Sequence, residues 1–283
     1  MWVVSMPSRM ELLAKNWKFQ VCAIIVIGIV MLGVVGPFVT RNPSDFAGGN
    51  YEPPSFKFLL GTDMAGRDIF AQLCTAIRDS LWVGIIAGLT ALLIAVVVGG
   101  FLAYKKGLVD EGANMVTNIF MVLPELVILI IIAALLSTRS LVVVGLLMGL
   151  LSWPWMARSI RSQILTLRER RFVDLARISG KSDLTIVVKE ILPNMLAYVF
   201  LVLILAVSGA IVWEASISVI GLGPTEGFTL GKMLEWAISF NAVSRGVWWY
   251  FAPPGLTLVI LTGTLIMITA VIDDVLNPKV RTE

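Results

Sequence analysis

Residues 168–194 read RERRFVDLARISGKSDLTIVVKEILPN, a basic, helix-compatible segment that lies between two uncharged runs. Both runs are long enough to cross a membrane. The chain as a whole is strongly apolar, with 58% hydrophobic and 14% charged residues. Because so apolar a chain keeps a charged segment of this size, we predict that the segment is a docking surface for a soluble partner, on the cytoplasmic side of a membrane protein.

Six apolar runs account for most of the chain. A helix needs roughly 20 residues to cross about 30 Å of hydrocarbon, and each run approaches or exceeds that length. Strands of a membrane barrel would alternate in short segments, which these runs do not. We therefore predict an all-α polytopic membrane protein with six transmembrane helices. The expected spans occupy residues 19–40, 80–104, 112–138, 140–157, 191–213 and 246–272.

The placement of Lys and Arg predicts the orientation of these spans. With the N-terminus inside, 15 of the 22 Lys and Arg residues fall in cytoplasmic segments. An excess of positive charge marks cytoplasmic loops, so both termini are expected in the cytoplasm. The net charge of +3 thus reports topology and gives no reason to expect a nucleic-acid partner.

The segments between the spans complete the expected organisation. Thr62 or Asp63 can cap a short helix whose apolar stripe would rest on the outer membrane interface, before the chain turns in near Trp82. Residues 1–18 are expected to lie along the lipid surface. The predicted segments are a cytoplasmic juxtamembrane segment at 1–18, a first transmembrane helix at 19–40, an extracytoplasmic loop with the interfacial helix at 41–80, a five-helix core at 81–276 with a cytoplasmic loop at 158–194, and a cytoplasmic tail at 277–283.

Gly180 divides the cytoplasmic loop into two halves. A glycine breaks a helix or permits a left-handed turn, so two short helices are expected to meet there at an angle. Ser182 or Asp183 can cap the second helix, and Pro193 marks the turn into the fifth span. Several arginines leave the surface basic, and Asp174 offers a carboxylate to a partner cation. A loop that serves only as a positively charged anchor, with incidental helicity, is the alternative.

The spacing within this loop resembles that of the inner-membrane permease subunits of ABC importers, in the dipeptide/oligopeptide/nickel permease family. The loop of that family reads Glu-Ala-Ala, three residues, Gly, nine residues, then Ile-x-Leu-Pro. The matching positions here are Asp174, Leu175, Ala176, Gly180, Leu192 and Pro193. The departures are Asp for Glu at 174, Leu for Ala at 175, and Glu190 where the family has Ile.

The resemblance extends over roughly residues 59–281, with further motifs in the family's order. The stretch LLGTDMAGRDIFAQLCTAIRDSLWVG at 59–84 is similar to the opening "LGTD…GRD…R.SL" block of the family. The stretch WEAS at 213–216, followed by GLG at 221–223, is similar to its "EASLSFLGLG" block. The stretch DVLNPKVR at 274–281 is similar to its closing block.

The resemblance implies an ABC importer type I permease in the inner membrane of a prokaryote. The implied partners are a second homologous permease subunit, two cytoplasmic ABC ATPase subunits and an extracytoplasmic solute-binding protein. ATP and Mg would be bound by the ATPase, and this chain would hold no cofactor or metal. The residues expected to couple to the ATPase are Asp174, Leu175, Ala176, Gly180, Ser182, Asp183, Leu192 and Pro193.

The chain itself offers no sign of an ATP site or a catalytic centre. Gly180-Lys181-Ser182 resembles the end of a phosphate-binding P-loop, but Leu175 stands where that motif needs its first glycine. The sequence contains no His, and it has neither metal-ligand spacing nor a Ser nucleophile with a base. We therefore expect a transport subunit, with ATP hydrolysis in a separate chain.

Two carboxylates fall inside or beside expected spans. Glu125 follows Pro124 near the middle of the third span, and Glu214 lies at the outer end of the fifth. A charge at the bilayer centre costs roughly 2.5–3.5 kcal/mol on insertion scales, so it usually faces a cavity or a partner. Both are candidate pathway residues, and Glu125 is a candidate contact for a substrate amine. The alternative is a protonated Glu125 that bonds a neighbouring helix.

Other functions stay open on the residues alone. A proton-coupled secondary transporter would use Glu125 and Glu214 and would need no ATPase. A membrane receptor or scaffold would recruit a signalling protein through residues 168–194 without solute flux. For an importer, peptides are the leading solute class, and oligosaccharides and metal chelates are further candidates.

Overall fold

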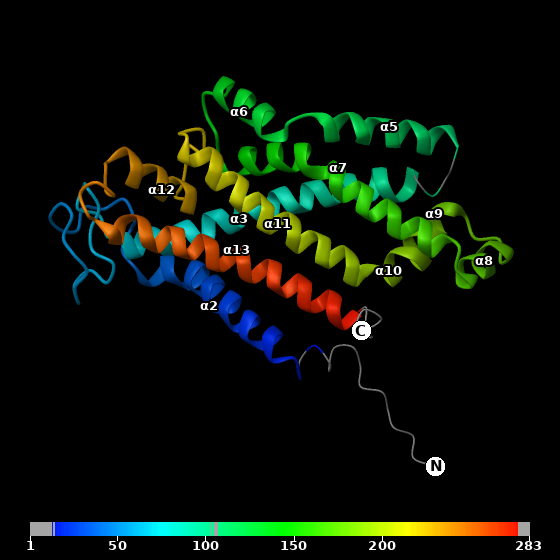
Figure 1. The fold of residues 1–283 in the computed structure, drawn as a ribbon, viewed down its shortest axis with the longest axis horizontal. Coiled ribbons are helices and arrows are strands. Elements are labelled where there is room, and N and C mark those ends of the chain that lie inside the picture. Colours follow the sequence, from blue (N-terminus) through cyan, green and yellow to red (C-terminus); the bar gives the residue numbers. More distant parts are fainter. Residues whose placement is uncertain (1–12, 14, 103, 105–106, 277–283) are drawn as a thin grey trace, which may run out of the picture. The chain divides into compact units, whose positions relative to one another are not determined.

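The computed structural model describes residues 13, 15–102, 104 and 107–276. The predicted tail at 277–283 and most of the predicted juxtamembrane segment lie outside these residues. Within the described residues, every named element is a helix (Figure 1). The elements are α2 (Trp17–Val39), α3 (Ile69–Ala95), η1 (Val96–Leu102), α5 (Leu108–Val122), α6 (Glu125–Leu135), α7 (Leu141–Arg168), α8 (Arg171–Ile178), α9 (Asp183–Ile186), η2 (Val187–Ile191), α10 (Leu192–Asn194), α11 (Leu196–Val219), α12 (Leu230–Ser239) and α13 (Trp248–Leu276).

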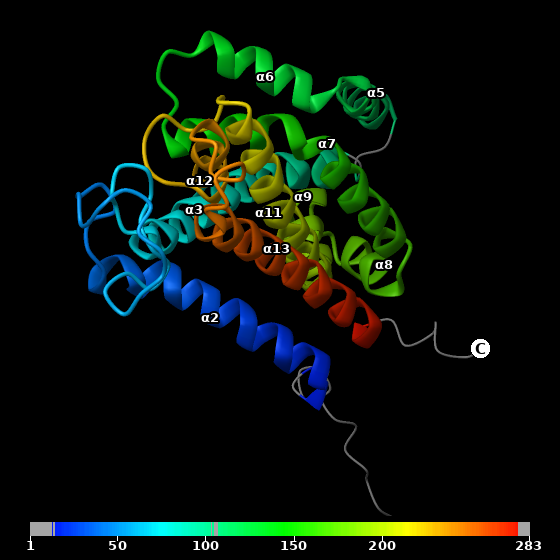
Figure 2. The same ribbon diagram turned by 60° about the vertical axis from the view of Figure 1, so that its left-hand side comes forward.

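The structure confirms the predicted helical membrane class. Within the described residues, five helices are long and apolar enough to cross a membrane by themselves. The sixth expected span is instead the pair α5 and α6, which is bent by 76° where Pro124 interrupts the helix. Figure 2 shows this change of direction between the two helices. The described residues therefore contain six candidate spans only if this bent pair counts as one span.

The chain folds into two compact units. The first combines residues 1–81, 214–221 and 227–283, and the second combines residues 82–213 and 222–226. In the first unit, α2 and α13 run side by side in opposite directions (Figure 1). Gly36 of α2 lies against Cys74 of α3 so closely that an added Cβ would approach the cysteine sulfur to 2.6 Å. Small residues allow this kind of close helix packing in membranes.

The start of α3 differs from the expected separate interfacial helix. The helix begins at Ile69 and continues without a break through Trp82. Its first turn is capped by Asp68, whose side chain accepts a hydrogen bond from the backbone N–H of Phe70, and not by Thr62 or Asp63. The loop before α13, predicted to lie outside, also contains a helix, α12, that the sequence did not lead us to expect.

In the second unit, α3 packs against both α7 and α11. A Cβ at Gly149 of α7 would come within 2.5 Å of Thr90, and a Cβ at Gly84 of α3 would come within 2.8 Å of Ile211. At 1.5 Å per residue, α7 is about 42 Å long, which exceeds the roughly 30 Å of bilayer hydrocarbon. Residues 158–168, expected as the start of the cytoplasmic loop, are therefore the last turns of this helix.

Candidate functional site

The loop predicted to be cytoplasmic contains a compact helix pair, α8 and α9, with Gly180 at its corner. Gly180 has a φ of +77°, in the left-handed region that favours glycine. The N–H of Gly180 donates to the carbonyl of Arg177, and the N–H of Lys181 donates to that of Ala176, which together end α8 in a Schellman motif. The Ser182 side chain then accepts from the N–H of Thr185 and caps α9. The predicted glycine corner and serine cap are confirmed.

One face of the helix pair is anchored to α7. Val173 and Ala176 of α8, together with Ile186 of α9, are buried in a cluster that includes Ile160 and Ile164 near the end of α7. The pair lies just beyond that end of α7 in Figure 1. Burying a side chain of this kind contributes roughly 1.5–3 kcal/mol. The pair is therefore fixed to the long helix by an apolar core of its own.

The opposite face of the pair exposes apolar side chains. Ile178 is 83% exposed, Leu175 is 65% exposed and Leu184 is 63% exposed. Asp174 is also exposed, and its carboxylate accepts a hydrogen bond from Arg177 at 3.2 Å within α8. Contiguous exposed apolar residues with a charged rim mark interaction surfaces. We call the exposed residues Asp174, Leu175, Ile178 and Leu184 the outer face of the pair.

Tyr104 lies outside the loop and contacts two arginines, one at the end of α7 and one in α8. The guanidinium carbons of Arg168 and Arg177 lie 5.0 and 5.7 Å from the centre of its ring. Arg177 also donates to the tyrosine hydroxyl at 3.3 Å, and this contact raises the pKa of the guanidinium above its ordinary value. No sequence signal singled out Tyr104, because a tyrosine after an apolar run is common at a membrane interface.

The predicted coupling residues divide into two groups. Ala176 is buried and Leu192 packs partly against the same core, so both hold the pair in place. The others lie at its surface: Asp174, Leu175, Gly180, Ser182, Asp183 and Pro193.

Glu125 lines a cavity of about 290 Å³ in the second unit. It is the first residue of α6 and follows the bend at Pro124. The other walls come from α7 and α11. The remaining lining residues are Met148, Ser152, Trp155, Leu205, Ala206, Gly209, Ala210 and Trp213. Glu125 thus lies at a cavity, and its role in a solute pathway stays a prediction.

Glu214 has a different environment from the one expected of a pathway residue. It is completely buried in the first unit, where its carboxylate accepts hydrogen bonds from Ser218 at 2.5 Å and Thr229 at 2.7 Å. Thr229 in turn caps α12 by accepting from the N–H of Lys232. Glu214 therefore ties α11 to the start of α12 and presents no surface to a solute within this chain.

The two family-like sequence blocks meet at this same point. Asp79 accepts from the N–H of Phe228 at 2.9 Å, and Ser80 accepts from the N–H of Leu230 at 2.9 Å. These residues of α3 satisfy N–H groups at the start of α12, which no preceding helical turn can satisfy. Asp79, Ser80 and Glu214 thus have a structural role that their motifs did not reveal.

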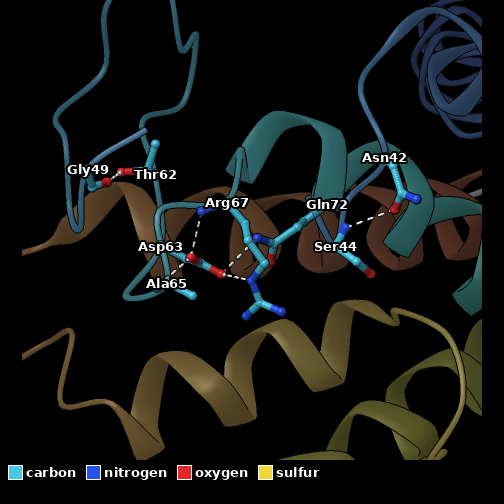
Figure 3. A network of polar contacts seen from close by, with 8 residues as sticks. All are labelled: Asn42, Ser44, Gly49, Thr62, Asp63, Ala65, Arg67 and Gln72. Carbon is cyan, nitrogen blue, oxygen red and sulfur yellow. Dashed lines mark hydrogen bonds and ion pairs between the residues drawn. The ribbon is translucent and has the colours of Figure 1, made fainter. Parts of the chain in front are cut away.

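A second polar cluster holds the loop before α3. Asp63 is buried and accepts from the backbone N–H groups of Ala65 and Arg67. Its other oxygen accepts from Arg67 Nε at 2.7 Å and from Gln72 Nε2 at 2.9 Å, as Figure 3 shows. The guanidinium of Arg67 also lies 4.9 Å from the ring centre of Trp236. This cluster gives Asp63 and Arg67 of the GTD and GRD motifs a structural role, because their bonds order the loop before α3.

An apolar helical bundle with a charged helix pair at one end and a carboxylate-lined cavity is typical of a membrane transport subunit. Residues 73–282 match the family described as "binding-protein-dependent transport system inner membrane component". The chain therefore belongs to this family, and it is the permease component of an ABC importer. Membership in the family and the apolar helices place it in a prokaryotic membrane as a multi-pass protein.

Relatives of known name cover almost the whole chain. A dipeptide transport system permease protein of Bacillus subtilis is 28% identical over 276 residues, which are 95% of this chain and 84% of the relative. An oligopeptide transport system permease protein of the same organism is 28% identical over 272 residues, which are 94% of this chain and 87% of the relative. A nickel transport system permease protein of Escherichia coli K12 is 27% identical over 285 residues, which are 96% of this chain and 98% of the relative. All three relatives are named as permease proteins of transport systems.

Proposed function

We propose that this chain is a permease subunit of an ATP-driven peptide importer and that the outer face of the α8–α9 pair docks a separate cytoplasmic ATPase. The observation that carries the proposal is the contrast between the two faces of the pair. One face is locked to α7 by buried apolar residues, while the other exposes Leu175, Ile178 and Leu184. An exposed apolar face can bind a partner protein. Because the other face is fixed to α7, a movement of that partner would be passed to the long helix.

The remaining parts of the importer are proposed from the family. A second homologous permease would complete the pathway, and an extracytoplasmic binding protein would deliver the solute. Two ATPases would bind ATP and Mg and would act on the two permeases through their cytoplasmic helix pairs. Alternating access would follow, because ATP would favour one arrangement of the spans over the other.

Peptides are proposed as the solute class. Relatives at similar identity are named for dipeptides, oligopeptides and nickel. Within the described residues no group of three or more His, Cys, Asp or Glu side chains could hold a metal ion. A metal chelate would therefore have to be recognised mainly by another subunit. Proton coupling through Glu125 and Glu214 is disfavoured, since Glu214 is enclosed in the packing around α12.

Docking through the outer face can be tested with Ile178→Asp and Leu184→Asp. Both side chains are exposed, so the changes cost little folding energy. Each places a carboxylate in an apolar contact, and we expect at least a tenfold loss of the ATPase that co-purifies with a tag on this chain. Val243→Asp, at an exposed apolar position outside the pair, serves as the matched control. Unchanged co-purification in both outer-face variants would contradict the proposal.

The proposed orientation can be tested with single cysteines at two exposed serines. Ser44→Cys is expected to react with a membrane-impermeant thiol reagent added to intact cells. Ser162→Cys, near the end of α7, is expected to react only after the membrane is permeabilised. The parent chain gives the background, because Cys22 and Cys74 are both buried. Labelling of Ser162→Cys in intact cells would contradict the proposed orientation of the chain in the membrane.

A further inference from the structure

We propose that the cavity beside Glu125 binds an ammonium group of the transported peptide. The inference rests on the proposed function and names the chemistry that this subunit recognises. Three helices meet at the cavity: α6 contributes its first residue, α7 contributes Ser152 and Trp155, and α11 contributes Gly209 and Trp213. At about 290 Å³ the cavity is at the small end of ligand pockets, so it suits one end of a peptide.

The charge of the cavity favours a cation. Among the residues that the structure describes, Glu125 is the only charged one that lines it. The carboxylate makes no hydrogen bond or ion pair with any residue that the structure describes. A lone carboxylate in an apolar bundle therefore leaves room for a positively charged partner from outside the chain.

The other polar lining group also suits a hydrogen-bond donor. The Ser152 hydroxyl already donates to the carbonyl of Met148 at 2.8 Å, so its oxygen is left as an acceptor. Trp155 and Trp213 add aromatic rings, whose faces attract cations. An ammonium group carries three donors and a positive charge, and it matches this combination of carboxylate, hydroxyl oxygen and indole rings.

The small residues of α11 keep the cavity open. A Cβ built at Gly209 would meet no atom of the described residues within 4 Å, so close packing does not require glycine there. A glycine inside a helix costs roughly 1 kcal/mol relative to alanine. Ala206 and Ala210 lie beside it on the same wall. Space for a ligand accounts for a small side chain at 209, whereas helix packing does not.

The test measures peptide binding to the full chain in its purified complex with the partner permease. The probe is trialanine, followed by the fluorescence of the tryptophans or by calorimetry. We expect Glu125→Gln to weaken trialanine binding at least tenfold, and Gly209→Leu to do the same by filling the cavity. Glu111→Gln removes an exposed carboxylate of α5 that does not line the cavity and should leave binding unchanged.

Modified peptides distinguish the source of the ammonium group. N-acetyl-trialanine lacks an ammonium group and should bind at least tenfold more weakly than trialanine, with no further loss in Glu125→Gln. N-acetyl-Ala-Lys-Ala keeps only a side-chain ammonium, and its binding tells whether the cavity selects the amino terminus or any ammonium.

Three results would overturn the assignment: equal binding of trialanine to wild type and Glu125→Gln, equal binding of trialanine and N-acetyl-trialanine to wild type, or binding of nickel ion that depends on Glu125. Co-purification of the ATPase with Glu125→Gln is measured in parallel. Its presence separates a failure of this assignment from a failure of the proposed importer.

Discussion

Asp63→Ala is expected to destabilise the folded chain by about 3–5 kcal/mol, the range for breaking a buried ion pair from one side. The change removes all four hydrogen bonds that the Asp63 carboxylate accepts. Arg67 Nε and the Gln72 amide would then be left without this acceptor. Native domains are stable by only about 5–15 kcal/mol, so the loss is a large share of the total. Thermal unfolding of the purified protein in detergent measures the effect.

Two further variants make the Asp63 prediction specific. Asp63→Asn keeps the shape of the side chain but loses its charge, and it should fall between wild type and Asp63→Ala. Asp45→Ala removes an exposed carboxylate from the same loop before α3 and should shift the midpoint of unfolding little. If Asp63→Ala and Asp45→Ala unfolded at the same temperature, the polar cluster would not be what orders this loop.

Gly99→Ala is expected to have the second-largest effect. A Cβ at Gly99 in η1 would lie 2.1 Å from the carbonyl oxygen of Ala157 in α7. The obstacle is backbone, so η1 and α7 would have to separate, and overpacking of this kind costs typically 1–3 kcal/mol or more. We expect a clear fall in the midpoint of thermal unfolding and a reduced yield of folded protein.

The neighbouring glycine supplies the control for Gly99. Among the described residues, a Cβ at Gly100 would meet only the terminal methyl of Ile164 at 3.3 Å and the side chain of Val96 at 3.9 Å. A flexible side chain can give way by a few tenths of an ångström, so Gly100→Ala should be close to neutral. Equal destabilisation by both variants would contradict the prediction, because the close contact with Ala157 would then not be the cause of the Gly99→Ala effect.

The helical class could be predicted because long apolar runs in this chain have few other stable structures. The continuous α3 could not, because the pattern at 69–81 has polar residues opposite an apolar stripe. Such a pattern ordinarily indicates a helix with one face in water. Here Gln72 and Asp79 are buried, since Asp63 and the N–H of Phe228 satisfy them. The burial of this polar face therefore depends on hydrogen-bond partners that are distant in the sequence.

The residues of the candidate sites could be predicted only where their type differs from that of the surrounding residues. Glu125 is a charge inside an apolar run, and Gly180 interrupts a helical segment, so each was visible. Trp155 and Trp213 are aromatic residues among other apolar residues, and nothing in the sequence separates a cavity wall from ordinary packing. Glu214 was equally visible as a charge, but its bond to Thr229 depends on α12, which the sequence did not reveal.

The length of α7 has a mechanical consequence. One continuous helix carries Ser152 and Trp155 in the wall of the cavity and Ile164 in the core that anchors the α8–α9 pair. From Met148 to Ile164 the axis runs about 24 Å at 1.5 Å per residue. Pro154 lacks the N–H that would bond the preceding turn, so α7 bends most easily between the two cavity residues. A force applied to α7 at its Arg168 end would therefore bend the helix near Pro154 and change the width of the cavity.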